Sequence, residues 1–198
     1  MANPLKYLNN NARAFTTKAS ALVNVLHSSV QVSEAFDPGS GAPMPTSMPC
    51  IAIWDTGAMG TVITSKVVAG LGLKPSGQIT VQGVGPAGIP QSHPADTYLI
   101  NLFLPNNVAL VGVRVAESSV SGCDVLIGMD VIGSGDLAIT NHNGKTTFTF
   151  RIPPCEEIDF VAEITEHNRR FGGGKPALAV EDQRKLKNKQ KAIRRKNR

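Results

Sequence analysis

Short runs of β-branched and aliphatic residues, broken by glycine, proline and asparagine, dominate the chain from residue 22 to residue 152. Runs of about four to eight such residues between turn-forming residues are typical of strands. Only one short helix is expected among them, over residues 66–71, with Gly72 at its end. This density of strands predicts an all-β barrel or sandwich. The expected strands are residues 22–26 and 30–33 (as a hairpin), 50–54, 61–64, 78–82, 96–104, 108–115, 124–127, 137–140 and 146–152.

The two ends of the chain differ in composition from this region. The first 19 residues are polar and irregular, which predicts a flexible lead-in. After Pro153-Pro154, apolar residues recur at helical spacing, and three glycines beginning at residue 172 then form a flexible joint. The sequence therefore predicts four parts: a lead-in (1–19), a β domain (20–155), a helix (156–171) and a glycine-hinged, disordered basic tail (172–198).

The charge is unevenly distributed. The 198 residues carry a formal net charge of +5, but residues 175–198 hold ten Lys and Arg against two acidic residues. Residues 1–174 hold ten against thirteen, which excludes a uniformly basic nucleic-acid-binding domain. The tail is interpreted as a solvated extension, with a weak, salt-sensitive and sequence-tolerant contact to nucleic acid as the alternative.

Membrane, secreted and metal-binding classes receive no support from the sequence. No apolar run approaches the ~18–20 residues of a membrane helix, and the N-terminus lacks the apolar segment of ~7–15 residues that a signal peptide needs. Cys50, Cys123 and Cys155 are an odd number without a C-x-x-C pair, which is typical of reduced thiols. The four histidines lack metal-ligand spacing. We therefore expect a cytoplasmic protein with no membrane contact, no metal and no other cofactor.

The most specific motif is Asp55-Thr56-Gly57-Ala58, which directly follows the apolar run at residues 50–54. By itself the motif also fits a β-turn or a helix cap. However, a glycine-rich segment (residues 81–88) lies about 28 residues downstream, and an apolar segment that ends in Ile127-Gly128 lies about 70 residues downstream. The order and spacing of three elements are more specific than any one of them.

In this order, the three elements resemble the retropepsin-like aspartic proteases over about residues 20–152. The resemblance implies a barrel in which a strand delivers the catalytic Asp55 to a cleft. Asp-Thr-Gly occurs once in this sequence, and catalysis by that family needs two carboxyl groups, one ionised and one protonated. The resemblance therefore implies a homodimer, whose two-fold axis supplies the second Asp55.

The resemblance also assigns roles to residues around Asp55. The residues after it support the active site, a glycine-rich flap covers the substrate, and an apolar segment completes a ψ-shaped loop beneath the catalytic group. The residues so assigned are Thr56, Gly57 and Ala58 for support, Gly83, Val84 and Gly85 in the flap, and Ile127 and Gly128 in the ψ-loop.

Other patterns are given a structural interpretation. Residues 83–88 match the dinucleotide-binding pattern G-x-G-x-x-G, but Pro90 and Pro94 follow where such a site needs a helix. An ordinary β-turn without a lid role is the alternative to a flap. Asp124 and Asp130 are interpreted as hydrogen-bonding residues and not as a second catalytic carboxyl group, and Cys123 as a structural thiol.

The resulting prediction is an aspartic endopeptidase with a retropepsin-like fold that hydrolyses peptide bonds in a protein or peptide substrate. Water would be activated between two Asp55 carboxyl groups across a homodimer. The alternative is a catalytically silent module of the same fold that dimerises or binds peptides, associated with nucleic acid through its tail.

Overall fold

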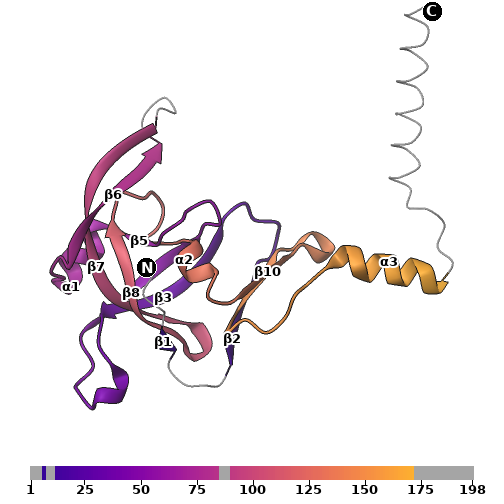
Figure 1. The fold of residues 1–198 in the computed structure, drawn as a ribbon, viewed down its shortest axis with the longest axis horizontal. Coiled ribbons are helices and arrows are strands. Elements are labelled where there is room, and N and C mark those ends of the chain that lie inside the picture. Colours follow the sequence, from indigo (N-terminus) through magenta and orange to yellow (C-terminus); the bar gives the residue numbers. More distant parts are fainter. Residues whose placement is uncertain (1–5, 8–11, 85–89, 172–198) are drawn as a thin grey trace, which may run out of the picture. The chain divides into compact units, whose positions relative to one another are not determined.

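The computed structural model describes residues 6–7, 12–84 and 90–171 (Figure 1). The chain divides into two compact units, residues 1–155 and residues 156–198. Of the predicted features, the flap residue Gly85 and the basic tail at 172–198 lie outside the described residues.

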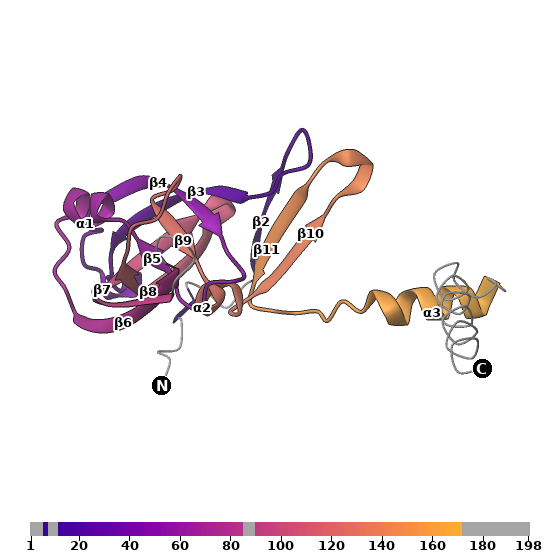
Figure 2. The ribbon, with the colours of Figure 1, turned by 90° about the horizontal axis from the view of Figure 1, so that it is seen from above.

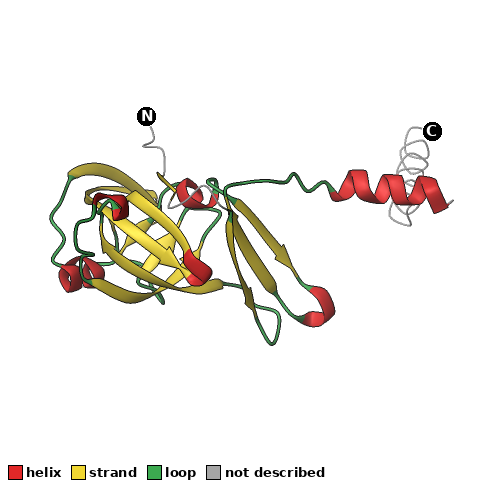
Figure 3. Ribbon diagram, turned by 90° about the horizontal axis from the view of Figure 1, so that it is seen from below, coloured by secondary structure: helices red, strands yellow, loops and turns green. Residues whose placement is uncertain are grey.

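Strands make up most of the first unit, and its helices are short (Figure 3). The strands are β1 (Lys6–Tyr7), β2 (Arg13–Lys18), β3 (Leu26–Glu34), β4 (Ser47–Trp54), β5 (Val62–Ile63), β6 (Gly77–Val84), β7 (Pro90–Leu104), β8 (Val108–Glu117), β9 (Val125–Ile127), β10 (Asp136–Thr140) and β11 (Thr147–Ile152). The α-helices are α1 (Ser65–Leu71) and α2 (Met129–Ile132) in this unit and α3 (Phe160–Phe171) in the second.

Six strands close into a barrel. Their order is β8-β5-β9-β4-β3-β7, and β7 pairs back onto β8. Strand β1 adds to the sheet beside β8, and β6 adds beside β7. The predicted all-β barrel with one short helix is confirmed; the single turn of α2 is an addition that the sequence pattern does not predict.

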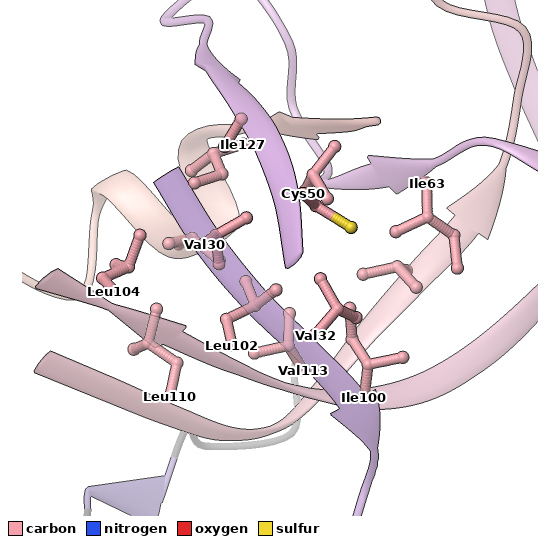
Figure 4. Close-up of a cluster of buried hydrophobic side chains, with 14 of the residues drawn as sticks. Val30, Val32, Cys50, Ile63, Ile100, Leu102, Leu104, Leu110, Val113 and Ile127 are labelled. Atoms are coloured by element: carbon pink, nitrogen blue, oxygen red, sulfur yellow. The ribbon is translucent and has the colours of Figure 1, made fainter. Parts of the chain in front are cut away.

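Side chains that alternate along the barrel strands fill its interior (Figure 4). Val30 and Val32 of β3 alternate with the exposed Ser29 and Gln31, as a strand buried on one face requires. Burying one such side chain contributes about 1.5–3 kcal/mol, so closure of the barrel is driven mainly by this core. Its largest fully buried side chains on the barrel strands include Val32, Ile63, Ile100, Leu102, Leu110, Val113 and Ile127.

A second sheet consists of β10, β11 and β2, in that order (Figure 2). Phe15 of β2 pairs with Phe150 of β11 and is only 4% exposed. Its ring lies 5.7 Å, centroid to centroid, from the ring of Trp54. The lead-in predicted for residues 1–19 is therefore wrong for residues 13–18. Residues 13–18 have no alternating apolar pattern that would predict a strand. They form a strand because they pair with β11.

The hairpin predicted at residues 22–26 and 30–33 is also wrong. Strand β3 runs without a break from Leu26 to Glu34 and pairs with both β4 and β7. The preceding residues join β2 to β3: the Val23 N–H donates to Thr146 Oγ1 (3.1 Å), and the Ala21 carbonyl accepts from the Thr146 N–H (3.1 Å). These bonds to a distant residue take the place of a hairpin ladder.

The helix predicted for residues 156–171 begins four residues later, at Phe160. Asp159 explains the start, because its Oδ1 accepts hydrogen bonds from the N–H groups of Val161 (2.9 Å) and Ala162 (3.1 Å). A side chain that satisfies the first free N–H groups of a helix fixes the position of its N-terminus.

Candidate active site

Asp55 stands at the end of β4, where that strand leaves the barrel. Strand β9 lies between β4 and β5: it pairs parallel with β4, Trp54 opposite Ile127, and antiparallel with β5, Val62 opposite Leu126. The chain therefore leaves β4, turns over the end of β9 and returns as β5 on its far side. A strand inserted between two antiparallel neighbours gives the ψ shape that the sequence resemblance implies.

Asp55 is half-buried, and one of its carboxyl oxygens is held by a hydrogen bond. Its Oδ1 accepts a hydrogen bond from the Gly57 N–H (2.8 Å), and its own backbone N–H donates to the carbonyl of Ile127 (2.9 Å). A Cβ atom on residue 57 would lie 3.2 Å from Oδ1. Glycine at this position thus lets a backbone N–H approach the carboxylate closely.

Gly128 lies directly beneath the turn that carries Asp55. A Cβ atom there would come within 2.6 Å of the backbone carbon and oxygen of Gly60, a distance that no side chain tolerates. The Ala58 carbonyl accepts from the Met129 N–H (2.8 Å), and the Met59 carbonyl accepts from the Asp130 N–H (3.2 Å). Gly128 and α2 therefore hold the turn from below.

Thr61 is a site residue that the sequence analysis missed. It is 2% exposed; its hydroxyl donates to Asp130 Oδ1 (2.7 Å), and its N–H donates to Asp130 Oδ2 (3.0 Å). The same hydroxyl oxygen accepts from the Gly128 N–H (3.1 Å). Nothing in a Thr-Val-Ile-Thr run marks the first threonine as buried, because its partners lie more than 60 residues away.

Asp124 and Asp130 both make structural hydrogen bonds, as interpreted from the sequence. Asp124 accepts from Lys66 Nζ (2.8 Å) through Oδ1 and from the Ile51 N–H (3.1 Å) through Oδ2. The Lys66 ammonium, through its hydrogen bond, holds the pKa of the Asp124 carboxyl below its usual range. No hydrogen bond joins either carboxyl group to Asp55 within residues 12–84 and 90–171. Asp55 therefore has no carboxyl partner within the described part of its own chain.

The two cysteines of this region have protonated thiols at neutral pH. Burial raises the pKa of Cys50 to about 11, and burial also raises the pKa of Cys123. A thiol with a raised pKa is a weak nucleophile. This agrees with the structural role expected for Cys123.

The predicted flap begins at the loop end of the β6–β7 hairpin. Gly83 pairs with Gln91, and Val84 pairs with Pro90. In the part of the chain that the structure describes, no hydrogen bond connects Gly83 or Val84 with Asp55. The structure thus places Asp55, Thr56, Gly57, Ala58, Ile127 and Gly128 together. The flap stays a prediction, since Gly85 lies outside the described residues.

A surface cavity of about 410 Å³ lies elsewhere, at the base of the same hairpin. It is lined by Ser65, Gln78, His93–Asp96 and Glu117–Ser119, and none of the predicted site residues lines it. Because no predicted site residue lines this cavity, the turn that carries Asp55 is kept as the candidate site.

The described residues contain no group of three His, Cys, Asp or Glu side chains placed to hold a metal ion. None of the described helices has the length and apolar character needed to cross a bilayer.

Comparison with known proteins gives a distant likeness to solved structures. No family model and no curated protein matches this chain. Among solved structures, the chain is similar to a retropepsin-like aspartic protease from Rickettsia conorii, with 11% sequence identity and a TM-score of 0.43. The match covers 71% of this chain and 95% of that chain.

Proposed function

We propose that this chain is an aspartic endopeptidase that acts as a homodimer, with the Asp55 carboxyl groups of two copies forming the catalytic pair. One observation carries the proposal: Asp55 ends a barrel strand at a ψ-shaped turn, half-buried, with Oδ1 held by the Gly57 N–H at 2.8 Å. This arrangement fixes the orientation of the Asp55 carboxyl group, which forms no ion pair among the described residues.

Peptide hydrolysis by carboxyl groups requires two of them in different protonation states. One must be ionised to take a proton from water, and the other must be protonated to polarise the scissile carbonyl. Two carboxyl groups about 3 Å apart cannot both ionise, so they share one proton. That titration belongs to the pair and not to either copy.

The reaction then follows from the shared proton. The ionised Asp55 deprotonates a water molecule held between the two groups, while the protonated one donates to the carbonyl oxygen, and a tetrahedral diol forms. Proton transfer to the amide nitrogen expels the amine. Loss of the shared proton stops the reaction, so we expect the highest activity in mildly acidic solution.

The neighbouring residues have supporting roles in this proposal. Thr56 hydrogen-bonds across the dimer axis, and Ala58 leaves room for the substrate backbone. The end of the β6–β7 hairpin, with Gly83, Val84 and Gly85, covers an extended substrate. Closing such a flap excludes bulk water from the carboxyl pair.

The Asp55→Asn variant tests the proposal. Asparagine keeps a side-chain oxygen for the Gly57 N–H but cannot take the proton from water. We expect peptidase activity between pH 3 and pH 7 to fall by roughly 10³-fold or more, measured with a mixed peptide library. Asp37→Asn is the matched control, because Asp37 Oδ1 accepts an equivalent hydrogen bond from the Gly39 N–H (2.8 Å) in an exposed loop.

Three results would contradict the proposal. Equal cleavage by the wild type and Asp55→Asn would show that Asp55 is not the catalytic group, and no cleavage by either would leave a silent module of the same fold. A purely monomeric wild type in sedimentation equilibrium under assay conditions would exclude the shared pair.

A further inference from the structure

Helix α3 carries an apolar stripe that is exposed along its length. Phe160, Ile164 and Phe171 are 67%, 56% and 74% exposed. His167 belongs to the same stripe, with its ring 4.8 Å from the ring of Phe171. These four residues, here called the α3 seam, are separated by four, three and four positions. That alternation is the seam spacing of helices that pack side by side.

A single helix of this kind is not stable by itself. α3 has 12 residues, and isolated helices of that length are marginal in water. Most helical stability in proteins comes from packing an apolar face against a partner. We therefore expect the α3 seam to pack against an apolar surface of similar length.

The α3 seam matches a second copy of itself when the two helices run in opposite directions. Phe160 of one copy then packs opposite Phe171 of the other, and Ile164 packs opposite His167. The four layers are related by a two-fold axis, so each contact is made twice. A self-complementary patch of this type is what a two-fold homodimer requires.

The charged residues beside the α3 seam favour the same arrangement. Glu163 and Arg170 lie on one flank of the seam, seven positions apart, so the antiparallel pair sets each Glu163 beside the Arg170 of the other copy. A parallel pair would set Glu163 beside Asn168, which carries no charge. Arg170 already binds Glu166 of its own helix (2.6 Å), but a guanidinium has five N–H donors and can serve both carboxylates.

We propose that α3 pairs antiparallel with α3 of a second copy of this chain, through the α3 seam and two Glu163–Arg170 ion pairs. The pairing is independent of the catalytic proposal, since it uses no residue of the ψ-loop. It contributes a second contact wherever the first unit also dimerises, and a second contact between linked modules raises overall affinity.

Cross-linking of the full chain tests the orientation. In a background with Cys123→Ser and Cys155→Ser, the variants Phe160→Cys and Phe171→Cys are oxidised separately and as a mixture. We expect a disulfide-linked dimer to form roughly tenfold faster in the mixture, because the antiparallel pair places residue 160 opposite residue 171. Two copies of residue 160 would lie about 16 Å apart, too far for a disulfide.

Ala162→Cys, on the outer face of α3, gives the background rate. Faster linkage of Phe160→Cys with itself would show a parallel pair and overturn the proposal. A mixture no faster than Ala162→Cys would overturn it too.

Charge reversal tests the same pairing without changing the α3 seam. Glu163→Arg should raise the dissociation constant of self-association on the order of tenfold, because two attractive pairs become repulsive. Adding Arg170→Glu should restore it. Adding Arg169→Glu should not restore the dissociation constant, because Arg169 lies on the outer face of α3. This variant is a matched control, since Arg169 also binds Glu166 (2.8 Å) and its substitution removes the same kind of contact within the helix. Equal restoration by both, or none by either, would overturn the proposal.

Discussion

Two glycines allow close contacts on different sides of the Asp55 turn. Gly57 brings a backbone N–H to the carboxylate from within the turn, and Gly128 lets the turn rest on the chain beneath it. Around them, Thr61 and Asp130 tie the turn to α2 through three hydrogen bonds from buried or partly buried groups. The position of Asp55 therefore depends on Gly128, Thr61 and Asp130 as well as on its own turn.

Gly128→Ala should displace this turn. The new Cβ would meet the backbone of Gly60 at 2.6 Å, and a rigid backbone cannot move aside cheaply. We expect a loss of about 1–3 kcal/mol in the free energy of unfolding, measured with urea, together with a loss of peptidase activity. Gly60→Ala is the control in the same turn, since its Cβ would meet nothing within 4 Å. Equal stability of the two variants would contradict the packing described.

The Lys66–Asp124 ion pair should make stability depend on pH. Lys66 lowers the pKa of Asp124 in the folded chain, so the pair stabilises the fold above the usual carboxyl pKa of 3.8 and loses its effect as the pH falls below it. Lys66→Ala should lower the urea midpoint more at pH 7 than at pH 3. Lys74→Ala, which removes another exposed lysine, should show no such difference between the two pH values.

At the scale of elements, two strands take their places only through distant partners. β9 has three residues, yet it separates β4 from β5 and so creates the turn above it. β2 extends the β10–β11 hairpin and inserts Phe15 against Trp54 and Phe148. The residues before the barrel are thus part of the folded unit.

Phe15→Ala should show how much β2 contributes. Removing a buried phenylalanine leaves a cavity beside Trp54, and the expected loss in the free energy of unfolding is about 3–5 kcal/mol. Lys18→Ala, at an exposed position on the same strand, should have little effect. If both substitutions leave urea unfolding unchanged, β2 does not belong to the cooperative unit.

At the scale of the whole molecule, the chain contains half of its proposed catalytic machinery. On the proposed mechanism, the single Asp-Thr-Gly of each barrel needs a second copy, and the proposed α3 pairing would add a separate contact between the same two copies. Two weak contacts linked in one chain can hold a dimer that neither holds alone.

The basic tail gives a prediction of its own. If residues 175–198 contact nucleic acid through phosphates, the affinity of the full chain for single-stranded RNA should fall steeply between 50 mM and 200 mM salt. Deleting residues 172–198 should abolish that binding in a filter or anisotropy assay. Binding that does not respond to salt would exclude a phosphate contact, and the tail would then be a solvated extension.

The sequence alone determined the all-β class, most strand positions and the strand–Asp55–strand order, because alternation, turn residues and chain order are local properties. Only the tertiary structure decided that residues 13–18 form a strand, that Thr61 is buried on Asp130, and that Gly128 lies against Gly60. Each of these features depends on contact between residues far apart in the chain. A local sequence pattern does not predict which distant residue will make that contact.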